Sequence, residues 1–322
     1  MMHILVFQHN DLDGYGAAAV IKNYHDMIHG GEDSIDFLEV NYAKKKIEFN
    51  RIKEFEEKKG YKYDLIYIVD LSISSTEAAK EYLKITKEYD FTIWIDHHLS
   101  SAGLKDEISE DLWGQIHKYD EEATLADCHV QYISMERSGA YLTWQYLYNS
   151  INVPKAIELI DDYDRWVHNY PESKCLNMAF YAIKELKDPS SEMWQNMLNS
   201  DNGLEEILKI GKVVKDYNDN QNDVARKGSM YITKFEGMDA ACINKKMNSD
   251  IFGDAYNEYP ICISYVFNGA QWVYTLYSNP KFGVDCSEIA KKYGGGGHAG
   301  AAGFTSDHFL VDPRESEEGE AL

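Results

Sequence analysis

Acidic and histidine side chains follow three apolar stretches of this chain, at spacings that suit a site for more than one metal ion. They are His9, Asp11 and Asp13 after residues 3–8, Asp70 after residues 65–69, and Asp96, His97 and His98 after residues 91–95. Alternate side chains of an extended segment point to the same side, so His9, Asp11 and Asp13 can converge on one point. Carboxylates and imidazoles are ligands for divalent cations. The pattern predicts a binuclear metal site.

The elements that must position these residues are short buried strands. Apolar runs of this length, bounded by polar residues, are typical of parallel strands, and ligands bind beyond the carboxyl ends of such strands. Helical patterns alternate with these runs, which favours an α/β fold with a mostly parallel sheet and flanking helices. We expect strands at 3–8, 35–40, 64–70 and 91–95, and helices at 14–21, 47–58, 76–88, 138–148 and 155–160.

A fourth acidic cluster follows the apolar helix that starts near residue 155. Asp161, Asp162 and Asp164 lie so close in sequence that they repel one another unless a cation or Arg165 compensates. A solvated helix end is the competing interpretation. For Asp70 the competing interpretation is a turn or capping carboxylate, and for Asp96-His97-His98 it is a solvated turn.

The second half of the chain has a different pattern of expected helices and strands. A long polar helix, residues 204–226, leads to strands near 229–234, 240–244, 261–267 and 272–277 and to a helix at 287–293. Four glycines, Gly294 to Gly297, precede His298. They follow a helix, which excludes a dinucleotide fingerprint, and a flexible linker is the simplest alternative. The small-residue segment after His298 favours a packed loop whose backbone N–H groups approach an anion.

Composition restricts the class of protein. The 322 residues carry a net charge of −22, which argues against tracking along duplex nucleic acid. The five cysteines form no Cys-x-x-Cys pair, no apolar run is long enough for a membrane span, and the start of the sequence has no secretory pattern. We expect a cytoplasmic protein that acts on a short phosphorylated substrate.

These motifs resemble those of a known family. His9-x-Asp11-x-Asp13-Gly14, Asp70, Asp96-His97-His98 and Asp162 are similar to the four motifs of the DHH phosphoesterase superfamily. Residues 284–290 and 294–304 resemble the DHH-associated C-terminal domain. The resemblance implies a catalytic domain at 1–187, a helical connector at 188–227, a smaller α/β substrate-binding domain at 228–311 and an acidic, disordered tail at 312–322.

The resemblance also implies roles for individual residues. His9, Asp11 and Asp70 would hold one Mn²⁺; Asp13, Asp70, His97 and Asp162 would hold the other, with Mg²⁺ or Co²⁺ as substitutes. From the acidic cluster we choose Asp162, with Asp161 and Asp164 as alternatives. His98 would face the phosphate, with Asp96 orienting a histidine. The substrate-binding residues would be Gly295, Gly296, Gly297, His298, Ser278 and Arg165. Tyr277 stands where many nucleotide-cleaving relatives have Arg.

The expected activity is hydrolysis of phosphodiester or phosphomonoester bonds in short nucleotides by in-line attack between two metal ions. Di- and oligonucleotides, linear products of cyclic dinucleotides and nucleoside bisphosphates are candidate substrates. The alternatives are an exopolyphosphatase or pyrophosphatase, a processive exonuclease, and a nucleotide sensor without catalysis. We expect no membrane partner and no long duplex, and a homodimer is compatible with the sequence.

Overall fold

The computed structural model describes residues 1–40, 50–116, 129–149 and 152–313, which form two compact units divided between Lys215 and Asp216. Cys128 and most of the acidic tail lie outside the described residues, as does the start of the helix predicted at 47–58. The division falls inside one long helix, α11 (Asp201–Ser229). Each unit has its own apolar core. None of the described helices is both long and apolar enough to cross a membrane.

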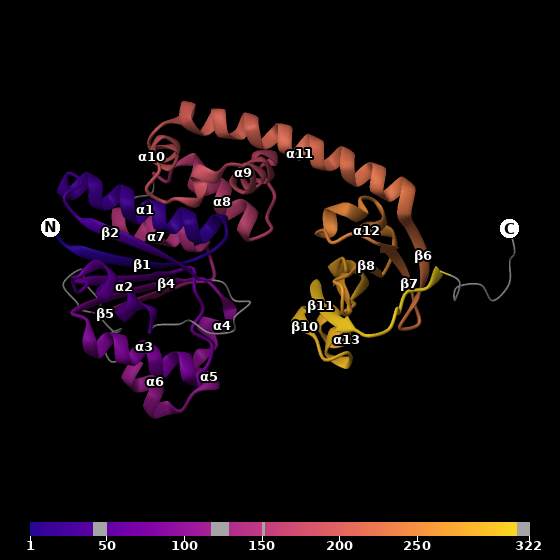
Figure 1. The fold of residues 1–322 in the computed structure, drawn as a ribbon, viewed down its shortest axis with the longest axis horizontal. Helices are drawn as coiled ribbons and strands as arrows, with labels where there is room; N and C mark the ends of the chain where they lie inside the picture. The colour runs from indigo at the N-terminus through magenta and orange to yellow at the C-terminus, as the bar shows by residue number, and fades with distance from the viewer. Residues whose placement is uncertain (41–49, 117–128, 150–151, 314–322) are drawn as a thin grey trace, which may run out of the picture. The chain divides into compact units, whose positions relative to one another are not determined.

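A parallel sheet organises the first unit (Figure 1). Its strands are β1 (His3–His9), β2 (Ser34–Val40), β3 (Leu65–Val69), β4 (Phe91–Asp96) and β5 (His129–Ile133). Their spatial order is β2-β1-β3-β4-β5, and all four pairings are parallel. The chain therefore changes direction across the sheet between β1 and β3, which is where open α/β sheets place their ligands. The predicted fold class is confirmed, although β5 was not predicted.

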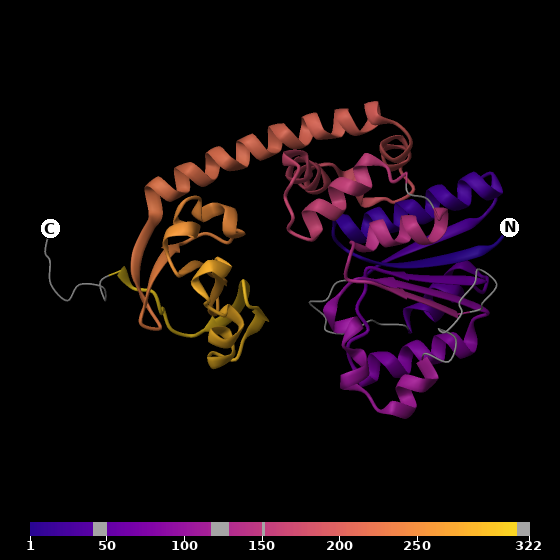
Figure 2. The same cartoon turned by 180° about the vertical axis from the view of Figure 1, so that it is seen from behind.

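Helices cover both faces of this sheet (Figures 1 and 2). They are α1 (Leu12–His29), α2 (Arg51–Lys59), α3 (Thr76–Glu88), α4 (Leu99–Ala102), α5 (Leu104–Glu107), α6 (Glu110–Ile116), α7 (Gly139–Tyr148), α8 (Lys155–Asp164), α9 (Pro171–Ala182), the 3₁₀ helix η2 (Lys184–Lys187) and α10 (Glu192–Asn199). Along β1, Ile4 and Val6 join the core under α1 and α7, whereas Leu5 and Phe7 join the core under α3. The sheet is thus buried on both faces, which explains its continuous apolar strands.

The second unit is a mixed sheet of six strands in the order β10-β11-β9-β8-β7-β6, in which only β7 and β8 pair in parallel. Its elements are β6 (Met230–Phe235), β7 (Met238–Ile243), η3 (Ser249–Phe252), α12 (Ala255–Glu258), β8 (Ile261–Phe267), β9 (Trp272–Tyr277), η4 (Pro280–Phe282), α13 (Cys286–Lys292), β10 (Gly296–His298) and β11 (Ala301–Ser306). The predicted strands are present. Gly296 and Gly297 of the predicted glycine loop form the edge strand β10 together with His298, whereas Gly294 and Gly295 precede it.

Candidate metal centre

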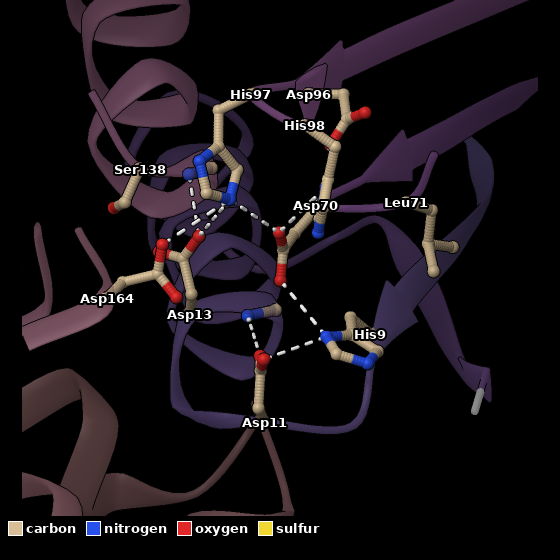
Figure 3. Close-up of polar contacts among 12 residues, drawn as sticks. His9, Asp11, Asp13, Asp70, Leu71, Asp96, His97, His98, Ser138 and Asp164 are labelled. Atoms are coloured by element: carbon tan, nitrogen blue, oxygen red, sulfur yellow. Dashed lines mark hydrogen bonds and ion pairs between the residues drawn. The ribbon is translucent and has the colours of Figure 1, made fainter. Parts of the chain in front are cut away.

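Imidazole and carboxylate groups meet at the carboxyl edge of the parallel sheet. His9 ends β1, Asp70 follows β3, and His97 follows β4. Asp11 and Asp13 lie at the start of α1, directly beyond β1. Figure 3 shows the side chains of all five pointing toward one another, joined by Asp164 from α8. The strand ends thus bring together residues that are far apart in the sequence.

Asp70 lies at the middle of this cluster. Its side chain is buried, with Oδ1 3.2 Å from Nε2 of His97 and Oδ2 3.6 Å from Nδ1 of His9. Its φ angle is +54°, in the left-handed region that few non-glycine residues adopt. Such strain persists where the surrounding structure imposes it, and it clusters at functional sites. The two carboxylate oxygens therefore face two different groups of ligands (Figure 3).

The first group consists of His9, Asp11 and one oxygen of Asp70. Nδ1 of His9 is 2.8 Å from Oδ2 of Asp11, while the N–H of Gly14 donates to Oδ1 of Asp11 at 3.0 Å. Asp11 is thus both the N-cap of α1 and a member of the cluster. A Cβ atom at Gly14 would lie 2.4 Å from the backbone oxygen of His9, so this tight turn requires glycine.

The second group consists of Asp13, His97 and Asp164. Nε2 of His97 lies 3.6 Å from Oδ2 of Asp13 and 3.4 Å from Oδ2 of Asp164. Asp13 is held from behind, because the N–H groups of Gly139 and Ala140 donate to its oxygens at 2.6 and 2.9 Å. These are orphan donors of the first turn of α7, and they favour the ionised carboxylate.

The carboxylates of the cluster repel one another, and a bound cation would relieve this repulsion. Burial and the charges of Asp11 and Asp13 raise the pKa of Asp70 well above its usual range. Burial and the charges of Asp13 and Asp70 do the same to the pKa of Asp164. Burial lowers the pKa of His9, but its contacts with Asp11 and Asp70 outweigh this and raise it to about 10. In the absence of a metal, the imidazole of His9 thus holds a proton as a partial substitute for a positive ion.

The donor set fits two divalent cations. In each of the two groups the ligand atoms lie within 4.8 Å of one another, and Asp70 can supply one oxygen to each. Its buried Oδ2 accepts no hydrogen bond from the described residues. A bound cation would satisfy this oxygen and remove the repulsion among the carboxylates. The mixture of carboxylate and imidazole is compatible with Mn²⁺.

Asp162 was predicted to be the fourth ligand, but its side chain binds backbone groups outside the cluster, and Asp164 takes the predicted place. The carboxylate of Asp162 accepts from the backbone N–H groups of Asn169 and Tyr170, at 2.8 and 3.2 Å. It therefore fixes the turn after α8. Asp164 reaches His97 instead. Two residues along a helix are rotated by about 200°, so neighbouring aspartates on α8 cannot serve the same point.

Asp161 and Arg165 hold the backbone next to the site in place. Asp161 accepts from the N–H of Ser138 at 2.7 Å and from the Nη1 atoms of Arg137 and Arg165 at 2.9 and 3.4 Å. It thereby anchors the loop before α7, which carries the donors to Asp13. Arg165 was predicted to bind substrate, and the structure places its guanidinium on Asp161, with a partly exposed side chain.

His98 and Asp96 form a pair at the rim of the cluster. Nδ1 of His98 is 2.7 Å from Oδ1 of Asp96, and 3.9 Å from Oδ1 of Asp70. Asp96 also accepts from the hydroxyl of Ser101, so both of its oxygens are used. Burial lowers the pKa of His98, but the hydrogen bond and charge of Asp96 outweigh this and raise it. His98 is partly exposed and can present an N–H donor to an anion.

The remaining predicted residues lie in the second unit. Gly295 donates its N–H to the carbonyl of Ala290, and Gly296, Gly297 and His298 form the exposed edge strand β10. The hydroxyl of Ser278 is buried and donates to the carbonyl of Pro260 at 2.7 Å. Tyr277 similarly donates to the carbonyl of Met247. Ser278 and Tyr277 therefore hold their own unit together.

Sequence reasoning missed the contribution of Gly139 and Ala140. A Cβ atom at Gly139 would lie 2.8 Å from Cβ of Asp70 and 3.0 Å from Oδ2 of Asp13, so only glycine allows this approach. The sequence signal was present, since Ser138 followed by glycine at a predicted helix start suggests exposed N–H donors. Their target, however, is 126 residues away in the chain.

Comparison with known proteins agrees with this geometry. Residues 3–160 match the family model described as "DHH family, N-terminal domain". Oligoribonuclease NrnB of Bacillus subtilis (strain 168) is 23% identical over 335 residues, covering 97% of this chain and 77% of NrnB. Uncharacterized protein R106 of Acanthamoeba polyphaga mimivirus is 22% identical over 310 residues, covering 91% of this chain and 64% of R106.

Solved structures show the same fold. The pGpG-specific phosphodiesterase PggH from Vibrio cholerae superposes with a TM-score of 0.53 at 14% identity, covering 94% of this chain and 92% of PggH. The DHH domain of a protein assigned to a family of ribosomal proteins superposes with a TM-score of 0.59 at 16% identity, covering 94% of this chain and 82% of that one. Residues 3–160 are therefore an N-terminal domain of the DHH family, and the relatives NrnB and PggH are named as an oligoribonuclease and a phosphodiesterase, both hydrolases of phosphoester bonds.

Proposed function

We propose that this protein hydrolyses phosphoester bonds of short nucleotides with the help of two Mn²⁺ ions. The observation that carries the proposal is the position of Asp70, whose two oxygens face two separate groups of metal ligands. Two metal ions held in this way supply Lewis acidity and an activated water for in-line displacement at phosphorus.

Individual residues of the cluster would have separate roles in this hydrolysis. Asp70 would fix the separation of the two groups, and the N–H donors of α7 would hold the carboxylate of Asp13 in place. His98 is oriented by Asp96 and donates an N–H to an oxygen of the substrate phosphate. This donor gains strength as negative charge develops on that oxygen, so it favours the transition state.

A short nucleotide is the substrate class that the observations favour. The net charge of −22 disfavours a long polyanion, because extended binding needs many basic contacts. The relatives NrnB and PggH are named as an oligoribonuclease and a pGpG-specific phosphodiesterase. We place the protein among enzymes that cleave di- and oligonucleotides.

The test is a substrate panel with purified protein and Mn²⁺. The panel contains pGpG, a five-nucleotide RNA, a 3′,5′-bisphosphorylated nucleoside, pyrophosphate and polyphosphate. Release of mononucleotides from pGpG or the short RNA, lost in Asp70→Asn, would support the proposal. Release of phosphate from pyrophosphate or polyphosphate without nucleotide cleavage would overturn it in favour of a phosphoanhydride hydrolase.

A further inference from the structure

A second cluster of metal-ligand residues lies at the opposite edge of the same sheet. His25 and His29 are one turn apart on α1, and Asp33 stands just before β2. The N–H of Met2, at the amino end of β1, donates to Oδ1 of Asp33 at 2.8 Å. The candidate metal centre begins at His9, at the other end of β1. At about 3.3 Å per residue, the two clusters are roughly 20 Å apart.

The three ligand atoms of this second cluster converge. Nδ1 of His25 lies 3.0 Å from Oδ2 of Asp33, Nδ1 of His29 also contacts Oδ2, and all three atoms lie within 4.8 Å of one another. The side chains of His25 and Asp33 are 3% and 2% exposed, whereas His29 is 37% exposed. His25 and Asp33 are thus buried, whereas an ion and a water molecule can reach them from the exposed side of His29.

The ligands are also supported from behind. Nε2 of His25 is 3.2 Å from the hydroxyl of Tyr67 on β3, and the N–H of Met2 occupies the outer oxygen of Asp33. If Nε2 of His25 donates its proton to Tyr67, the lone pair of Nδ1 points at Asp33. Metal-ligating histidines usually donate their other N–H in this way.

We infer that His25, His29 and Asp33 form a third metal site, with a preference for Zn²⁺ over Mn²⁺. Two imidazoles and one carboxylate, with a fourth position open to water, are a common ligand set for zinc. The candidate metal centre has more carboxylates than imidazoles and suits a harder cation. The ion would tie the last turn of α1 to the start of β2 and, through Asp33, to Met2, and so stabilise the amino edge of the sheet.

The test is zinc stoichiometry after equilibrium dialysis of the full-length protein and its variants. We expect His29→Ala to bind one Zn²⁺ fewer per chain than wild type. The same difference should separate Asp70→Asn from the double variant Asp70→Asn/His29→Ala, since Asp70 belongs to the other centre. His308→Ala, which removes an exposed histidine of the second unit, should bind as much zinc as wild type.

Two further measurements separate a metal site from a hydrogen-bond network. Tyr67→Phe keeps all three ligands and should weaken zinc binding by about 10-fold. Zinc should raise the melting temperature of Asp70→Asn and not that of the double variant. Equal zinc contents in wild type and His29→Ala, or a melting difference between them that zinc does not alter, would overturn the inference and leave only an Asp33-centred hydrogen-bond network.

Discussion

The first unit brings several carboxylates together in one cluster, whereas in the second unit the buried hydroxyls of Thr233, Ser264 and Ser278 each donate to a backbone carbonyl. Asp70, Asp13 and Asp164 crowd into one cluster, and Asp70 adopts a strained backbone conformation there. In the second unit, the buried hydroxyl of Ser278 donates to a single carbonyl, that of Pro260. Polar groups that compensate one another contribute to stability, whereas crowded like charges cost stability unless an ion binds. We therefore expect substitutions in the carboxylate cluster to change activity, and substitutions at satisfied buried groups such as Ser278 to change stability.

Replacing Asp70 should have the largest effect. Asp70→Asn removes a charge shared by both ligand groups while keeping a side chain that tolerates positive φ. Metal catalysis contributes several kcal/mol, so we expect kcat/KM for a cleaved dinucleotide to fall about 1000-fold, with a melting temperature no lower than that of the metal-free wild type. Steady-state kinetics and thermal melts measure both. A fall of less than tenfold would mean that Asp70 does not bridge the two groups.

The neighbours Asp164 and Asp162 provide a matched pair on one helix. Asp164→Asn should lower kcat/KM about 100-fold without lowering stability, because it removes a partly buried carboxylate that like charges repel. Asp162→Asn should cost about 1 kcal/mol of stability, since one of its two backbone N–H partners loses an acceptor. Its kcat/KM should change less than tenfold. The opposite pattern in the two variants would restore Asp162 as the metal ligand.

Metal removal should reveal the proton held by His9. The pKa of His9 is about 10 in the folded, metal-free protein and 6.5 in the unfolded chain. The folded state therefore binds the proton more tightly, and this stabilisation is present below pH 6.5 and is lost as the pH rises toward 10. With EDTA, we expect stability to fall by on the order of 3 to 4 kcal/mol between pH 6.5 and 9.5, since each unit of pKa shift corresponds to about 1.4 kcal/mol.

Thermal melts with EDTA or with Mn²⁺ at the two pH values test this expectation. His9→Gln is the control and should show a smaller decrease with EDTA. Saturating Mn²⁺ should also reduce the decrease, because a ligating histidine is already deprotonated. If the pH dependence were the same with and without Mn²⁺, the proton on His9 would not be a substitute for a metal ion.

Ser278→Ala should have the smallest effect, and on stability alone. Loss of one buried hydrogen bond costs about 1 kcal/mol, which lowers the melting temperature of a domain of roughly 100 residues by about 4–8 °C. We expect kcat/KM to stay within twofold of wild type. A tenfold rise in KM with an unchanged melting temperature would show instead that Ser278 contacts the substrate, as the family resemblance implies.

The sequence by itself determined the fold class and named most of the residues that meet in the candidate metal centre. Periodicity placed four of the five parallel strands, because buried strands are short apolar runs that end in polar residues. The same run ends placed His9, Asp11, Asp70 and His97 at one edge of the sheet, since parallel strands share their carboxyl edge. Local spacing also indicated the turn at Gly14.

Only the tertiary structure decided which aspartate of α8 faces the metal centre. The rotation of the helix and the turn after it assign Asp161, Asp162 and Asp164 to three different partners, and this depends on how α8 packs against α1 and α7. The donors of Gly139 and Ala140 are equally non-local, because they meet Asp13 across the core. A one-dimensional pattern records which residue types are available, whereas packing decides which of them share a point in space.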